Sequence, residues 1–319
     1  MNQSRAALAA IAISISLAMI ATVQTGRPAL QDRQEQEKIT VVASFYPLYE
    51  FASRVVGDRA EVSSLVPAGV EPHDWEPTAE DISRVRAADV LVINGAGFER
   101  WADDMEAKVV ANTSEGIEFN YKEGKEVGDD EHGHGDATGG RGGVNNPHIW
   151  LDPILAKHQI DKIRNMMASS DPANADYYNQ NAERFTAELD SLDAFIRSEL
   201  ADCDKSDFIA FHDAFTYFSE RYGLRQHSIH GASPEGEILP QTMQQIIEFA
   251  NEFDINIIYS EDLIDSRLAD TIANEIPEGK VLVLSPIEGI DKEEQAAGIG
   301  YIDKMKQNIA NLKEGLECR

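Results

Sequence analysis

Short apolar runs alternate with amphipathic segments from residue 39 onward, and this alternation constrains the fold more than any other feature of the sequence. In the first half we predict strands at ITVVASF, AEVSSLVP and DVLVIN, with helices at PLYEFASRVVG and TAEDISRVRAA between them. The second helix begins after Thr78 and carries Asp81 three residues later, which is the spacing of a capping box. Strands that alternate with helices in this way predict a parallel sheet with helices on both faces.

The same order of elements returns in the second half. We predict strands at FIAFHD, QHSIHG, INIIYSE and KVLVLSP, helices at AFTYFSERYG, PQTMQQIIEFANEFD and DSRLADTIANEI, and a last helix at YIDKMKQNIANLKEGL. The predicted fold is therefore an α/β protein with two parallel-sheet lobes, residues 39–169 and 203–319.

A long segment without an internal glycine separates the two lobes. Its apolar residues recur near helical spacing, so we predict one rigid linking helix over residues 170–202. A helix of about 30 residues would span about 45 Å, longer than most helices within one domain. Two shorter helices with a break between them are the alternative.

The first 38 residues are interpreted as a signal peptide or N-terminal anchor followed by a polar linker. The stretch from Ala6 to Val23 is apolar and carries no charge, and its length just suffices to cross a membrane. Whether it is cleaved stays open, but either case places the remaining chain outside the cytoplasm. In an oxidising compartment the only two cysteines, Cys203 and Cys318, can pair or stay free, and their spacing does not suit a metal site.

The charge of the chain excludes one class of partner. With 28 basic and 56 acidic residues the net charge is -28, which would repel nucleic acid and anionic lipid surfaces. Part of the acidity lies in residues 122–143, a glycine-rich loop that contains His132 and His134. We expect this loop to be too polar to order itself, so its histidines are weak candidates for a built site.

Three of the eight histidines lie where elements meet. His73 follows the second predicted strand, His148 precedes a helix in NPHIW, and His212 ends the strand FIAFHD. Each histidine alone is explained as a hydrogen-bonded residue at an element end. Together they predict a metal site in the cleft between the lobes, because ligands of open α/β sheets bind at the carboxyl ends of strands and neutral imidazole suits zinc.

A fourth ligand is expected from the segment that follows the strand KVLVLSP. Glu288 and Asp291 are the candidates there. Glu288 follows the strand by a tight Ser-Pro-Ile turn, whereas Asp291 lies in a charged run typical of a solvated surface. We therefore favour Glu288.

Several segments resemble the zinc and manganese solute-binding proteins of ATP-binding-cassette importers, most closely the ZnuA-like zinc branch. They are VVASFYPLYEFASRVVGD, GVEPHDWEPTAEDISRVRAADVLVINGAGFERW, NPHIWLDP, FIAFHDAFTYFSERYGL and LVLSPIEGI, within a resemblance that runs from Ile39 to Leu316. The resemblance implies two α/β lobes joined by one long helix, with a metal ion between them. The matching ligand histidines are His73, His148 and His212.

Two positions bear on which metal the resemblance implies. Many relatives carry an aspartate at the position of Ser285, whereas some zinc-binding members place a glutamate ligand three residues later, at Glu288 here. Manganese-binding relatives often have glutamate at the position of His212. A nitrogen-rich set of three histidines and one glutamate favours Zn2+ over Mn2+.

The resemblance implies an extracytoplasmic protein that captures zinc and delivers it to an ATP-binding-cassette permease, as a monomer and without enzymatic activity. A manganese-binding homologue is the nearest alternative. A zinc-dependent hydrolase would use the three histidines, leave the fourth position to water and take Asp74 or Asp213 as its base. A surface adhesin or metal buffer would share the same site.

Overall fold

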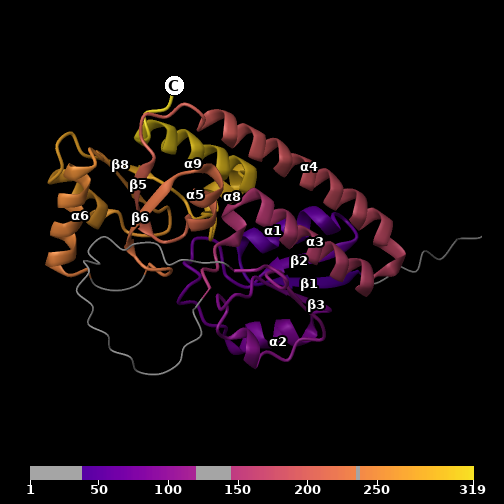
Figure 1. Cartoon of the computed structure of the whole chain (residues 1–319). Helices are drawn as coiled ribbons and strands as arrows, with labels where there is room; N and C mark the ends of the chain where they lie inside the picture. The colour runs from indigo at the N-terminus through magenta and orange to yellow at the C-terminus, as the bar shows by residue number, and fades with distance from the viewer. Residues whose placement is uncertain (1–37, 120–144, 235–237) are drawn as a thin grey trace, which may run out of the picture. The chain divides into compact units, whose positions relative to one another are not determined.

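A computed structural model describes residues 38–119, 145–234 and 238–319. Two four-stranded parallel sheets dominate it, so the predicted fold class is confirmed (Figure 1). The limits that we predict for the individual lobes stay a prediction. The apolar stretch Ala6–Val23 and the loop 122–143 with His132 and His134 lie outside the described residues. Within the described ranges, no helix is both long and apolar enough to span a membrane.

The first sheet has the strand order β2-β1-β3-β4. Its strands are β1 Ile39–Ala43, β2 Ala60–Ser64, β3 Val90–Ile93 and β4 Val110–Asn112, and its connecting helices are α1 Tyr46–Val56 and α2 Ala79–Ala87. The capping box at Thr78 and Asp81 is present at the start of α2. Strand β4 was not predicted: it is a three-residue edge strand of which only Ala111 is buried, and its apolar run Val109–Ala111 is too short to indicate a strand.

The second sheet repeats this plan with the order β6-β5-β7-β8. Its strands are β5 Asp207–His212, β6 Arg225–His230, β7 Ile257–Ser260 and β8 Lys280–Val283. Its helices are α5 Thr216–Tyr222, α6 Pro240–Glu252, α7 Arg267–Asn274, α8 Lys292–Ala297 and α9 Tyr301–Gly315. In both sheets the central strands are the most deeply buried, which places the strand ends of β1, β3, β5 and β7 inside the molecule.

The long helix between the sheets is shorter than the predicted 170–202. Helix α4 spans Ala175–Glu199, 25 residues, and it follows α3, Pro153–Ser170, through the short 3-10 turn Pro172–Asn174. The cause is Pro172, which disfavours helical backbone at Asp171, where φ is -136° and ψ is 74°. Asp171 then accepts hydrogen bonds from Asn174 and Tyr178, which fixes the turn.

One apolar core joins the two lobes. The largest buried cluster contains Phe45 and Trp150 from the first half of the chain together with Phe208, Tyr259 and Ile309 from the second. Helix α4 packs on α1 and α3 and also on α9, as Figure 1 shows. The lobes therefore share a continuous apolar interior.

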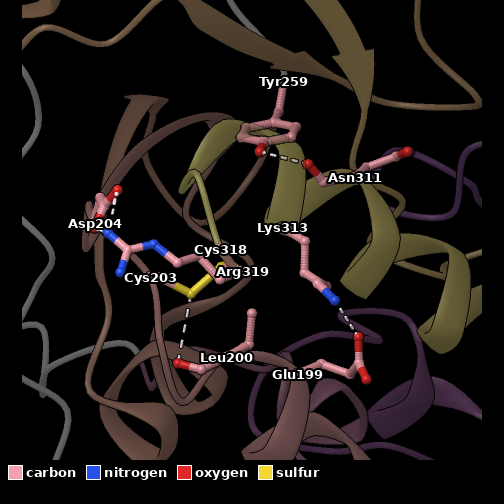
Figure 2. The surroundings of a disulfide bond; sticks show 9 residues. All are labelled: Glu199, Leu200, Cys203, Asp204, Tyr259, Asn311, Lys313, Cys318 and Arg319. Atoms are coloured by element: carbon pink, nitrogen blue, oxygen red, sulfur yellow. Dashed lines mark hydrogen bonds and ion pairs between the residues drawn. A yellow bond between two sulfur atoms is a disulfide. The ribbon is translucent and has the colours of Figure 1, made fainter.

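The two cysteines are bonded to each other. The disulfide joins Cys203, just beyond α4, to Cys318, across a sequence separation of 115 residues. Figure 2 shows the ion pair of Lys313 with Glu199 near the disulfide, and Arg319 pairs with Asp204. The end of α9 is thereby held against the end of α4.

Candidate metal centre

Four side chains from distant parts of the chain meet between the lobes: His73, His148, His212 and Glu288. Each offers one ligand atom, and these atoms all lie within 4.8 Å of one another. The Oε1 atom of Glu288 lies 2.9 Å from Nε2 of His148, 3.1 Å from Nε2 of His73 and 3.4 Å from Nε2 of His212. The structure thus brings together the same four residues that the sequence suggests, with all three histidines presenting Nε2.

Each lobe contributes two of these residues. His73 lies in the loop between β2 and α2, and His148 immediately precedes the 3-10 turn Ile149–Leu151 that leads into α3. His212 is the last residue of β5, and Glu288 follows β8. His148, His212 and Glu288 are buried, while the side chain of His73 is 8% exposed. Of the four side chains, that of His73 is therefore the most accessible in the described part of the chain.

The turn that carries Glu288 is held by helix α9. Asn308 accepts a hydrogen bond from the amide of Ser285 at 2.8 Å and donates to its carbonyl at 2.7 Å. The hydroxyl of Ser285 accepts from the amide of Ile287, which has the unusual φ of 55°. A non-glycine residue in this left-handed conformation needs support from its surroundings, and the Asn308 and Ser285 contacts supply it.

The competing carboxylates have other roles. Asp291 caps helix α8, because its side chain accepts from the amide of Glu294 at 2.7 Å. Asp213 accepts from the hydroxyl of Thr216, and Asp74 is exposed. Of the carboxylates that the sequence analysis considers near the site, Glu288 is the one whose oxygen lies among the imidazole nitrogens.

Two residues that the sequence analysis did not single out orient the buried histidines. The side-chain oxygen of Asn146 lies 2.7 Å from Nδ1 of His148, and Oε1 of Glu261 lies 2.5 Å from Nδ1 of His212. With the proton on Nδ1, each ring donates to its partner and turns Nε2 toward the common centre, the arrangement that metal-binding histidines usually show. The sequence holds a signal for Glu261, an acidic residue directly after a buried strand.

Burial and the surrounding charges act in opposite directions on these groups. Burial, supported by His212, lowers the pKa of His148 to about 3 although the hydrogen bond to Glu288 opposes this. Burial also lowers the pKa of His212, but the carboxylates of Glu261 and Glu288 outweigh it and hold this pKa well above its ordinary value. The pKa of His73 is raised as well, because Glu288 outweighs the effect of burial.

The pKa of Glu288 is shifted in the opposite direction to that of His212. Burial raises its pKa, but the three nearby imidazoles outweigh burial and hold the pKa well below its ordinary value. The carboxylate is therefore ionised at neutral pH and can pair with a cation that displaces the protons of the imidazoles.

Aromatic rings form an apolar wall beside the histidines. The ring of Phe98 lies 5.0 Å from that of His73, and the ring of Trp150 lies 5.0 Å from that of His148. Trp75, which the sequence also places near His73, packs against Trp101. The apolar wall lowers the local dielectric and strengthens the attraction between a bound cation and the carboxylate.

The other described histidines have local partners. Nε2 of His158 lies 2.9 Å from the carbonyl oxygen of Glu115, and Nε2 of His227 lies 2.9 Å from Asp207. His230 packs against the ring of Phe211. These contacts account for the three histidines without a metal.

Comparisons with known proteins agree with this geometry. The family described as "ZnuA: Zinc-uptake complex component A periplasmic" matches residues 41–315. The "High-affinity zinc uptake system protein ZnuA" of Bacillus subtilis is 39% identical over 286 residues, which are 88% of each chain. The "Zinc-binding lipoprotein AdcA" of Streptococcus pneumoniae is 32% identical over 88% of this chain, which spans 56% of that longer relative.

A solved structure extends the comparison to three dimensions. The laminin-binding protein Lmb of Streptococcus agalactiae, described as "a bifunctional protein with adhesin and metal transporting activity", superposes with a TM-score of 0.76 at 28% identity. The superposition covers 88% of this chain and 100% of that chain.

Proposed function

The chain belongs to the ZnuA family of zinc-uptake complex components, and we propose that it captures a zinc ion outside the cytoplasm and delivers it to an ATP-binding-cassette permease. The observation that carries the proposal is the set of four ligand atoms within 4.8 Å of one another, drawn equally from the two lobes. A single ion bound there would couple both lobes.

The chemistry of the four residues supports zinc as the ion. Three imidazole nitrogens and one carboxylate oxygen make the four-coordinate, nitrogen-rich set that zinc accepts, whereas manganese prefers more oxygen ligands. Glu288 also compensates part of the charge of the dication, which is costly to leave unpaired in a buried site. We propose His73, His148, His212 and Glu288 as the ligands.

The same set argues for binding rather than catalysis. Catalytic zinc sites keep a position open for water, while here Glu288 lies where a fourth ligand belongs. The disulfide between Cys203 and Cys318 supports a location in an oxidising compartment. We propose that the protein acts there as a monomeric carrier that the permease recognises.

Metal analysis and competition titration test this function. Protein purified without chelators and without a metal-affinity step should bind one zinc ion per chain, and more tightly than manganese. The variant His148→Ala should lose tight binding, and the matched variant His158→Ala, which removes a histidine of α3 outside the site, should keep it. Equal or tighter binding of manganese would contradict the assignment of zinc.

Adhesion at the cell surface is a second candidate, favoured by the similarity to the laminin-binding protein. A solid-phase binding assay with laminin decides it, because an importer component without adhesive activity would give no saturable signal.

A further inference from the structure

Glu261 and His212 lie side by side at the ends of neighbouring strands. Strands β5 and β7 are parallel with Ile209 opposite Ile258. Three residues further along each strand, His212 ends β5 and Glu261 follows β7 directly. The register itself therefore places the carboxylate beside the imidazole, and both side chains are at least 95% buried.

The two fully buried histidines have chemically different partners. His148 contacts the side-chain amide of Asn146, which carries no charge, whereas His212 contacts the carboxylate of Glu261. Both partners can hold the proton on Nδ1 and leave Nε2 to the ion. Only Glu261 can in addition place a negative charge behind its histidine.

The carboxylate of the next residue, Asp262, contacts other groups. Asp262 accepts from the buried ammonium group of Lys304 and from the hydroxyl of Ser285. Lys304 also pairs with Glu294 at 2.9 Å. The positive charge of Lys304 is thus bound by Asp262 and Glu294, while the carboxylate of Glu261 lies against His212.

From this geometry we infer that Glu261 is a positioning residue for the ion: it fixes the ring of His212 with Nε2 toward the centre and adds a second negative charge behind the first ligand shell. The inference rests on the proposed zinc site and deepens it. A dication held by one ligand carboxylate keeps a net positive charge, and the charge of Glu261, transmitted through the polarised imidazole, offsets it. Glu261 would therefore contribute to how tightly zinc is held without touching it.

Two substitutions separate the roles of shape and charge. Glu261→Gln keeps an oxygen that accepts the Nδ1 proton but removes the charge, and Glu261→Ala removes both. We expect zinc affinity to fall about 10-fold in the glutamine variant and about 100-fold in the alanine variant, the range found for partners of metal-binding histidines. The exposed residue Glu275 provides a control, because Glu275→Gln removes one charge from the same lobe and should leave zinc affinity unchanged.

Absorption spectra of the cobalt-loaded proteins give a second measurement. The glutamine variant should keep the visible bands of the unsubstituted protein, because the donor atoms stay in place, and the alanine variant should shift them. Circular dichroism identifies a variant that does not fold. If the alanine variant does not fold, the glutamine variant decides the question, because its side chain has nearly the same shape as that of glutamate.

The possible outcomes are distinct. If the unsubstituted protein binds no zinc, the proposed function is wrong and this inference is wrong with it. If the unsubstituted protein binds zinc and both Glu261 variants bind zinc as tightly as it does, the inference alone is overturned. A glutamine variant as weak as the alanine variant, with an equally altered cobalt spectrum, would contradict the positioning role.

Discussion

Trp150 in the first lobe donates its indole N–H to the backbone carbonyl of Pro286 in the second lobe, at 2.8 Å. Trp150 follows His148 by two residues, and Pro286 precedes Glu288 by two. Tyr301 in turn donates its hydroxyl to the carbonyl of Trp150 at 2.6 Å. The indole bond therefore links the segment that carries a candidate ligand in one lobe to the segment that carries a candidate ligand in the other.

Removing this bond should loosen the site. In Trp150→Phe the buried carbonyl of Pro286 loses its donor, which should lower the free energy of unfolding by about 1–3 kcal/mol. Zinc affinity should fall as well, because the turn that carries Glu288 is less restrained. Chemical denaturation and competition titration measure the two effects, with Trp101→Phe as a control outside the bond. Undiminished zinc affinity in Trp150→Phe would show that the bond does not position the site.

The choice of carboxylate ligand can be tested directly. Glu288→Ala should weaken zinc binding by orders of magnitude, because the site loses its charged ligand and leaves the cation poorly compensated. Asp291→Ala should instead lower the free energy of unfolding by about 1 kcal/mol, since it removes the cap of α8, and leave zinc affinity unchanged. Competition titration of both variants decides the assignment, which is wrong if the Asp291 variant is the one that loses zinc.

Zinc affinity should fall as the pH is lowered, and the fall should begin above the ordinary histidine pKa of about 6.5. The pKa of His212 is held well above its ordinary value and that of His73 is also raised, so zinc must displace protons from these rings. Because a raised pKa keeps the ring protonated to higher pH, affinity should rise as pH increases through this range and fall as pH drops.

His148 should not take part in this proton exchange, because its pKa is lowered to about 3 and its ring is already neutral. Calorimetry in buffers of different ionisation enthalpy counts the protons released on zinc binding. Zinc binding without proton release near neutral pH would contradict the raised pKa values of His73 and His212.

The histidines in the loop should be dispensable for tight binding. Deleting residues 129–143 removes His132 and His134 but none of the four candidate ligands. The deleted protein should therefore bind one zinc ion with nearly unchanged affinity, while weaker additional binding is lost. Titration of both proteins under matched conditions tests this, and loss of the tight step in a folded deletion variant would place a ligand within the loop.

The alternation of apolar and amphipathic segments was sufficient to predict two parallel α/β lobes, because strand and helix periods differ along the whole chain. The pattern did not predict the short elements. Strand β4 has three residues at a sheet edge, and helix α8 has six residues and a cap but no buried face. The predicted start of the linking helix, at residue 170, is too early because Pro172 begins a 3-10 turn instead of the long helix.

The candidate ligands could be found from the sequence because they lie at element ends or in unusual local settings. Asn146 could not be found in this way, and Glu261, although it directly follows a buried strand, could not be paired with His212, since both roles depend on contacts that no local pattern encodes. The contact of Glu261 with His212 follows from the register of β5 against β7, and Asn146 donates to the carbonyl of Asp213, 67 residues away. Such partners become visible only when strands are aligned and lobes are packed.

The disulfide of Figure 2 makes most of the second lobe a closed covalent ring. A protease that cuts one peptide bond anywhere between Cys203 and Cys318 opens the ring but releases no fragment. Such a nicked chain would migrate as one species in a denaturing gel without reductant and would separate into two pieces once the disulfide is reduced. The disulfide would hold the two pieces together wherever the cut falls within the ring, so a single cut there leaves the protein one covalent molecule.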